Sequence, residues 1–136
     1  MDKIKEAVKF HGHLGPYLIL GVLAGEIALK RIGVKKYFGL EVKVYGANQK
    51  PKSCLIDGLQ LSTGATFGKG NIRKLAGKNI KISARNLKKN KEAIIFFQPS
   101  LVERLNNLKG KKDSKVFARK LLRINNKGLF QLKIKG

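Results

Sequence analysis

The order of apolar and polar residues divides the chain into helical and extended segments. Asp2–Phe10 carries apolar side chains on one face and lysines on the other, which is typical of a short amphipathic helix. Pro16 suits the first turn of a second helix, because the N–H that proline lacks is not used there. This helix runs to about Gly33 and is apolar on nearly every side, so we expect it to be buried. Gly21 and Gly25 share one of its sides, where another element can pack closely.

The rest of the chain mixes strands and helices without a regular strand–helix–strand rhythm. We expect strands at Leu40–Tyr45, Asn79–Ala84, Ala93–Phe97 and Gly128–Ile134, and helices at Cys54–Leu61, Pro99–Leu108 and Val116–Ile124. Asp113 or Ser114 is suited to cap the last of these helices. The pattern predicts a single α+β domain over residues 1–136, with a mixed or antiparallel sheet packed with helices around the buried apolar helix.

Composition favours a globular protein and excludes several classes. Hydrophobic residues make up 43% of the 136 residues and charged residues 28%, which is not the composition of a disordered chain. No apolar run reaches the roughly 18 residues that cross a bilayer, and the first residues lack the apolar stretch of a signal peptide. Cys54 is the one cysteine, so an intrachain disulfide is excluded. We therefore expect a cytoplasmic protein without a membrane span.

The charge is strongly positive. Thirty Lys and Arg against eight Asp and Glu give a formal net charge of +22, so weak nonspecific binding of polyanions is expected. The candidate basic patch consists of Lys111, Lys112, Lys115, Arg119, Lys120 and Arg123. Two interpretations stay open: an ordinary lysine-rich surface, or a nucleic-acid-binding protein that uses its C-terminal half. Aromatic residues amount to only 7%, which disfavours stacking on single-stranded bases.

Metal-binding chemistry is concentrated in three residues. His11 and His13 flank a glycine at the break between the first two helices, so both imidazoles can turn toward one point. Cys54 stands at the start of a predicted helix, where the helix dipole, Lys50 and Lys52 are expected to lower its pKa and favour the thiolate. Asp57, three residues on, can face the same side and orient a histidine. Histidines and a lone cysteine with only structural roles are the alternative.

A third candidate is the glycine-rich loop Thr63–Asn71, with Thr66, Lys69 and Asn71 as ligand-binding residues. It does not match the phosphate-binding loop of nucleoside triphosphatases, because Gly70 rather than Ser or Thr follows Lys69. We expect instead that its backbone donors and Lys69 face a small anion.

These motifs together resemble those of the FmdE family, which is named after a component of formylmethanofuran dehydrogenase. The resemblance rests on Phe-His-Gly-His-Leu-Gly-Pro at residues 10–16, Ser-Cys-x-x-Asp at 53–57 and Thr-Gly-Ala-Thr-Phe-Gly-Lys-Gly-Asn at 63–71. It is strongest over residues 4–95; the basic helix and strand of residues 99–136 are less diagnostic. Two positions depart from the family pattern, because Gly15 and Ala65 stand where the family has cysteines. The C-terminal four-cysteine zinc module of many relatives also has no counterpart here.

The resemblance implies an α+β core, a homodimer and a pocket for a divalent metal, zinc in the first instance, held by His11, His13 and Cys54. Three ligands would leave the site open to water or an unidentified small molecule. The function that the resemblance implies is an accessory or enzymatic role linked to one-carbon or molybdopterin metabolism. A domain that has lost its ligand and serves as an interaction module is the remaining alternative.

Overall fold

A five-stranded mixed sheet and six helices form the structure, a computed structural model that describes residues 3–136. The helices are α1 (Lys3–His11), α2 (Pro16–Ile32), α3 (Cys54–Thr63), α4 (Pro99–Asn106), α5 (Gly110–Leu121) and α6 (Asn126–Leu129). The strands are β1 (Leu40–Tyr45), β2 (Ile72–Leu75), β3 (Lys81–Asn86), β4 (Lys91–Phe97) and β5 (Phe130–Lys135). This arrangement confirms the α+β class; Asp2 lies outside the described residues.

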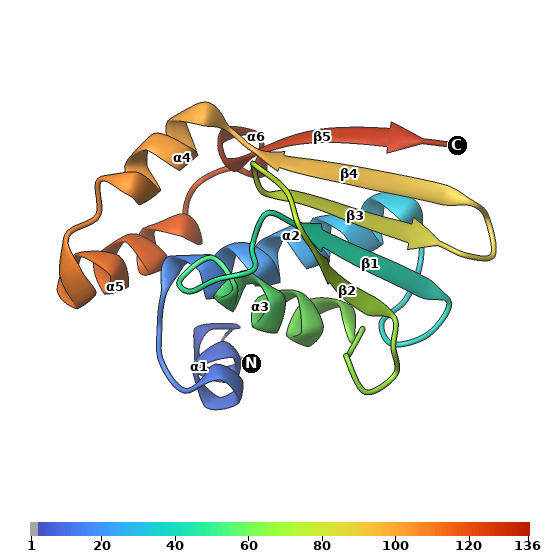
Figure 1. Ribbon diagram of the computed structural model, residues 1–136, viewed down its shortest axis with the longest axis horizontal. Helices are drawn as coiled ribbons and strands as arrows, with labels where there is room; N and C mark the ends of the chain where they lie inside the picture. Colours follow the sequence, from blue (N-terminus) through green and yellow to red (C-terminus); the bar gives the residue numbers. More distant parts are fainter. Residues whose placement is uncertain (1–2) are drawn as a thin grey trace.

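The sheet has the strand order β2-β1-β3-β4-β5. β1 pairs with β2 in parallel, with Val42 opposite Ile72, and the other three pairings are antiparallel. The buried positions of β1 alternate, so one face of the sheet enters the core. α2 lies against the sheet between α3 and α5, and α1 lies on the far side of the α2–α3 layer from the sheet (Figure 1).

α2 is the buried central helix that the sequence predicts. Twelve of its seventeen residues are buried, and it begins at Pro16 and ends at the left-handed residue Gly33, whose N–H donates to the carbonyl of Leu29. The side that carries Gly21 and Gly25 faces α3. A methyl group added at Gly21 would lie 2.2 Å from the carbonyl oxygen of Leu55, so the two backbones touch.

Glycine on α3 makes the same contact from the other side. A Cβ at Gly58 would lie 2.1 Å from the carbonyl oxygen of Leu18 and 2.9 Å from the Cα of Gly21. Ser62, one turn further along α3, donates to the Gly21 carbonyl at 3.2 Å. Two helices therefore cross at backbone contact, a distance that only glycine permits.

Several boundaries differ from the sequence prediction. β2 was not predicted, because only its first residue, Ile72, is buried and its four residues do not alternate. α5 begins at Gly110 rather than Val116, because its first turns are polar and show no hydrophobic period. Asp113 lies inside α5 and accepts a hydrogen bond from the backbone N–H of Lys109, so the expectation that it or Ser114 precedes the helix as the cap is wrong.

The last segment also differs: Gly128 belongs to α6, and β5 begins at Phe130. β3 extends to Asn86 rather than Ala84, because Asn86 pairs with Leu40 of β1 and Lys91 of β4, and its buried side chain donates to the carbonyl of Ile32 at 2.9 Å. Among residues 3–136, no single helix is long and apolar enough to cross a membrane; α1 and α2 pass such a test only as a pair, bent by 119°.

The α2–α3 crossing predicts that Gly58→Ala strongly destabilises the fold. The added methyl group overlaps backbone atoms that cannot rotate away, so we expect a loss of about 3 kcal/mol, near the upper end for overpacking. In thermal unfolding this is a decrease in Tm of roughly 10 °C. Gly68→Ala is the control, since its Cβ meets only the Thr66 hydroxyl at 3.9 Å. Equal Tm values for the two variants would contradict the backbone contact between α2 and α3.

Candidate metal centre

The two histidines meet because the chain reverses at Gly12. His11 is the last residue of α1, and Gly12 has a φ of +109°, a conformation that residues with a side chain rarely adopt. The reversal brings the rings to a centroid distance of 4.6 Å, and their Nε2 atoms lie 3.1 Å apart.

Cys54 joins the histidines from the first turn of α3. One ligand atom from each of His11, His13 and Cys54 lies within 4.8 Å of the other two. The tetrahedral edge between two nitrogen ligands of zinc, each bonded at about 2.05 Å, is about 3.3 Å. The Nε2–Nε2 distance of 3.1 Å is close to this value, so the three side chains fit the donor set of a divalent metal.

Asp57 fixes the tautomer of His11. Its Oδ2 lies 2.5 Å from His11 Nδ1, and its Oδ1 accepts a longer hydrogen bond from Gln60. Because an ionised carboxylate only accepts, this contact places a hydrogen on the Nδ1 of His11 and leaves its Nε2, which lies 3.1 Å from the Nε2 of His13, as the ring atom that can bind a metal. Carboxylate, imidazole and metal in this order are the usual arrangement around a metal-bound histidine.

The Cys54 thiol differs from the sequence expectation. Burial raises the pKa of Cys54, and the negative charge of Asp57 raises it further; Lys50 and a backbone hydrogen bond lower it less. The expected thiolate is therefore wrong for the metal-free protein. A bound metal would reverse this balance, because coordination deprotonates a thiol. Metal uptake at this site should accordingly release a proton and weaken as the pH falls.

The Thr63–Asn71 loop lies beyond the opposite end of α3. A ten-residue helix is about 15 Å long, so Ala65 and the loop are far from Cys54. The backbone N–H of Thr66 donates to Asn71 and that of Lys69 to the Thr66 hydroxyl. The Lys69 ammonium donates to the carbonyl of Gly64. These three donors thus have partners inside the loop, and anion binding by the loop stays a prediction.

A cleft of about 620 Å³ adjoins the candidate metal ligands. His13 and Cys54 line it on one wall, and Lys111, Ser114 and Lys115 of α5 line it on another. The structure therefore brings two members of the basic patch to the candidate metal centre. The other members, Lys112, Arg119, Lys120 and Arg123, are exposed on or beside α5 and do not line this cleft.

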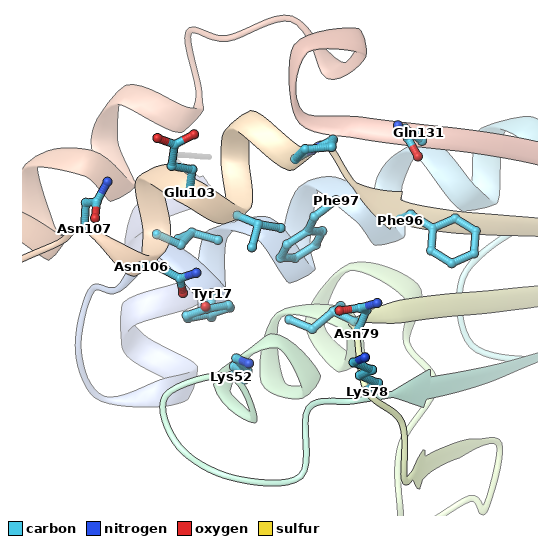
Figure 2. A pocket seen from close by; sticks show the side chains of 14 residues that line it. Tyr17, Lys52, Lys78, Asn79, Phe96, Phe97, Glu103, Asn106, Asn107 and Gln131 are labelled. Atoms are coloured by element: carbon cyan, nitrogen blue, oxygen red, sulfur yellow. The ribbon is translucent and has the colours of Figure 1, made fainter.

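Tyr17 separates this cleft from a larger one of about 800 Å³ and lines both. In the larger cleft, Tyr17 and Phe97 stack at a centroid distance of 6.5 Å, with Lys52 and Lys78 on one side and Glu103 on the other (Figure 2). Sequence reasoning missed both clefts. Their walls come from helices α2 to α5, from β4 and β5, and from the loops before α2, α3 and β3, and no sequence signal places those segments side by side.

Metal-free protein should show a raised Cys54 pKa in alkylation kinetics. We expect the rate of reaction with iodoacetamide to rise with pH to a midpoint above the ordinary thiol value of about 8.5. Asp57→Asn should move the midpoint down, because removing the carboxylate charge favours the thiolate. Glu103→Gln removes an equal charge away from the thiol and should leave it unchanged. A midpoint below about 8.5 in the natural sequence would contradict this, because it would mean that the helix N-terminus lowers the pKa of Cys54 by more than burial raises it.

Known proteins resemble this chain in both sequence and fold. A "Probable S-adenosyl-L-methionine-binding protein" of Archaeoglobus fulgidus is 32% identical over 116 residues, a match that covers 72% of this chain and 32% of that protein. The chain thus spans about a third of that relative's length. A tungsten formylmethanofuran dehydrogenase FmdE-like protein from Syntrophus aciditrophicus superposes with a TM-score of 0.68, covering 97% of this chain and 69% of that one. At 18% identity, this likeness concerns the fold alone.

The family comparison covers nearly the whole described structure. The family model described as "FmdE, Molybdenum formylmethanofuran dehydrogenase operon" matches residues 10–130, from the start of the histidine motif to the beginning of β5. The chain belongs to the FmdE family.

Proposed function

We propose that this FmdE-family domain binds one divalent metal ion, zinc in the first instance, through His11, His13 and Cys54. The observation that carries the proposal is the convergence of these three ligand atoms within 4.8 Å, from two segments about forty residues apart. The ordered ring of His11 adds support, since Asp57 holds its Nδ1 and leaves Nε2 for a ligand.

The proposed site is open. Three protein ligands leave one position of a tetrahedral zinc for water or a small molecule, as in catalytic rather than structural zinc sites. When bound there, the ion would act as a Lewis acid toward that molecule. The residues around it would keep their own roles: Asp57 orients His11, and Leu14 and Tyr17 give the cleft apolar walls.

The biological setting that we propose follows from the family. Its description names the molybdenum formylmethanofuran dehydrogenase operon, and we infer a supporting or enzymatic role in one-carbon or molybdopterin-linked metabolism. The homodimer implied by the sequence resemblance and the cytoplasmic location stay predictions. So does nonspecific binding of polyanions by the basic surface.

Elemental mass spectrometry of untagged protein tests the site directly. After exposure to zinc and removal of excess metal, we expect about one zinc per chain. His13→Ala and Cys54→Ala should each abolish retention, because two ligands do not hold zinc against dialysis. Asp57→Asn should weaken binding about 10- to 100-fold, while Glu103→Gln should not. Zinc that persists in both alanine variants, with unchanged Tm, would refute the assignment.

Restoring a cysteine at position 15 should close the site. Gly15 has an extended backbone, with φ at −148°, and a Cβ there would lie 3.4 Å from Cε1 of His13, so a side chain is tolerated beside the cluster. Gly15→Cys should therefore add a fourth ligand and tighten zinc binding by about ten-fold or more. The measurement is competition with a chromophoric chelator, with a phosphine reductant present to prevent a disulfide with Cys54.

Ala65→Cys is the matched control for this prediction. It also restores a cysteine of the family pattern, but at a buried position beyond the far end of α3. Within one chain it should leave zinc affinity unchanged to within about two-fold, because the added thiol lies roughly 15 Å from Cys54. Equal tightening by both variants would show that the site is not the cluster described here.

A further inference from the structure

The cleft beside the candidate metal ligands has one strongly polar side. Lys111 and Lys115 lie one turn apart on α5 and, with Ser114 between them, form the wall that this helix contributes. The candidate ligands His13 and Cys54 also line the cleft. A molecule inside it would therefore touch the basic patch and the proposed metal position together.

The two lysines of this cleft have no carboxylate partner within residues 3–136. No carboxylate lines the cleft, and within residues 3–136 the ammonium groups of Lys111 and Lys115 form no ion pair. The nearest acid in sequence, Asp113, is occupied by the backbone N–H of Lys109. The two lysines thus offer two positive charges that are not held in an ion pair, and a bound metal would add to them.

The remaining walls are apolar. Leu14, Pro16 and Tyr17 at the start of α2 are buried, and Pro51 closes the cleft from the loop before α3. Apolar walls offer contact to a hydrocarbon or aromatic body. Lys111 and Lys115 are themselves exposed, so a charge pair with them is partly screened by water.

We propose that this cleft binds a small organic anion: an apolar body that carries one carboxylate or phosphoryl group, held by Lys111 and Lys115. The proposal rests on the proposed function for the neighbouring metal and names the class of molecule that reaches it. A volume of about 620 Å³ lies in the usual range for small-molecule sites, whereas a nucleic acid would follow exposed phosphate contacts along the surface.

The test is titration of isotope-labelled protein followed by ¹H–¹⁵N NMR, in metal-free and zinc-loaded form, at about 0.15 M salt to screen long-range attraction. Benzoate and phenylphosphonate are the anionic probes, and they distinguish the carboxylate from the phosphoryl group. Benzamide is the neutral probe of the same shape. We expect saturable shifts at Leu14, Gly15 and Ser114 with at least one anion, and binding of benzamide weaker by about ten-fold.

Two double variants with the same change in net charge distinguish binding in the cleft from attraction by the overall positive charge of the protein. Lys111→Gln with Lys115→Gln should weaken anion binding by about ten-fold, whereas Lys112→Gln with Lys120→Gln should change it by less than about two-fold. Equal loss in both double variants would overturn the proposal, because the net charge of +22 would then account for binding. Benzamide that binds as tightly as benzoate would overturn it as well.

Metal content measured on the same samples keeps the two proposals apart. Zinc retention without anion binding refutes the anion cleft and leaves the metal site standing. Lysine-dependent anion binding in protein that retains no zinc refutes the metal site and supports the cleft. Both double variants retain all three candidate ligands, so their zinc content should equal that of the natural sequence.

Discussion

The backbone contact between α2 and α3 is the constraint on which the candidate site depends. Gly21 and Gly58 let the two helices touch, and any side chain there would push them apart. α2 begins three residues after His13, while α3 begins with Cys54 and carries Asp57 one turn later. A wider crossing would move the thiol and the carboxylate away from both rings. The geometry of the candidate metal centre is thus set by packing in the core, away from the three candidate ligands themselves.

The electrostatics of the candidate site favour a protonated Cys54 thiol in the metal-free protein. Asp57 orders His11 through Nδ1, and the same carboxylate, together with burial, raises the pKa of Cys54. Without an ion, the raised pKa keeps the Cys54 thiol protonated near neutral pH. A divalent cation bound there would be attracted by the Asp57 carboxylate. The charge that disfavours the Cys54 thiolate in the metal-free protein would then stabilise the bound cation.

The basic surface and the candidate metal centre are not separate features of this molecule. Lys111 and Lys115 belong to the patch that suggested nucleic-acid binding, yet they line the cleft that contains His13 and Cys54. The remaining bases of the patch lie outside this cleft. Part of the positive charge therefore lies beside the candidate ligands, where we propose that it holds a small anion, and nonspecific attraction of polyanions by the rest stays a prediction.

The sequence by itself determined the long elements and the candidate ligands. The apolar α2, the alternating β1 and the helix that begins at Cys54 are local patterns, because hydrophobic period and glycine or proline punctuation act within one segment. It could not determine β2, whose four residues have no period, or the polar start of α5. The sign of the Cys54 pKa shift also escaped it, because burial and Asp57 outweigh the helix terminus only in the folded chain. Only the tertiary structure placed α5 at the cleft, since that contact joins segments far apart in the chain. It also showed that the length of α3 separates the glycine-rich loop from the candidate metal ligands.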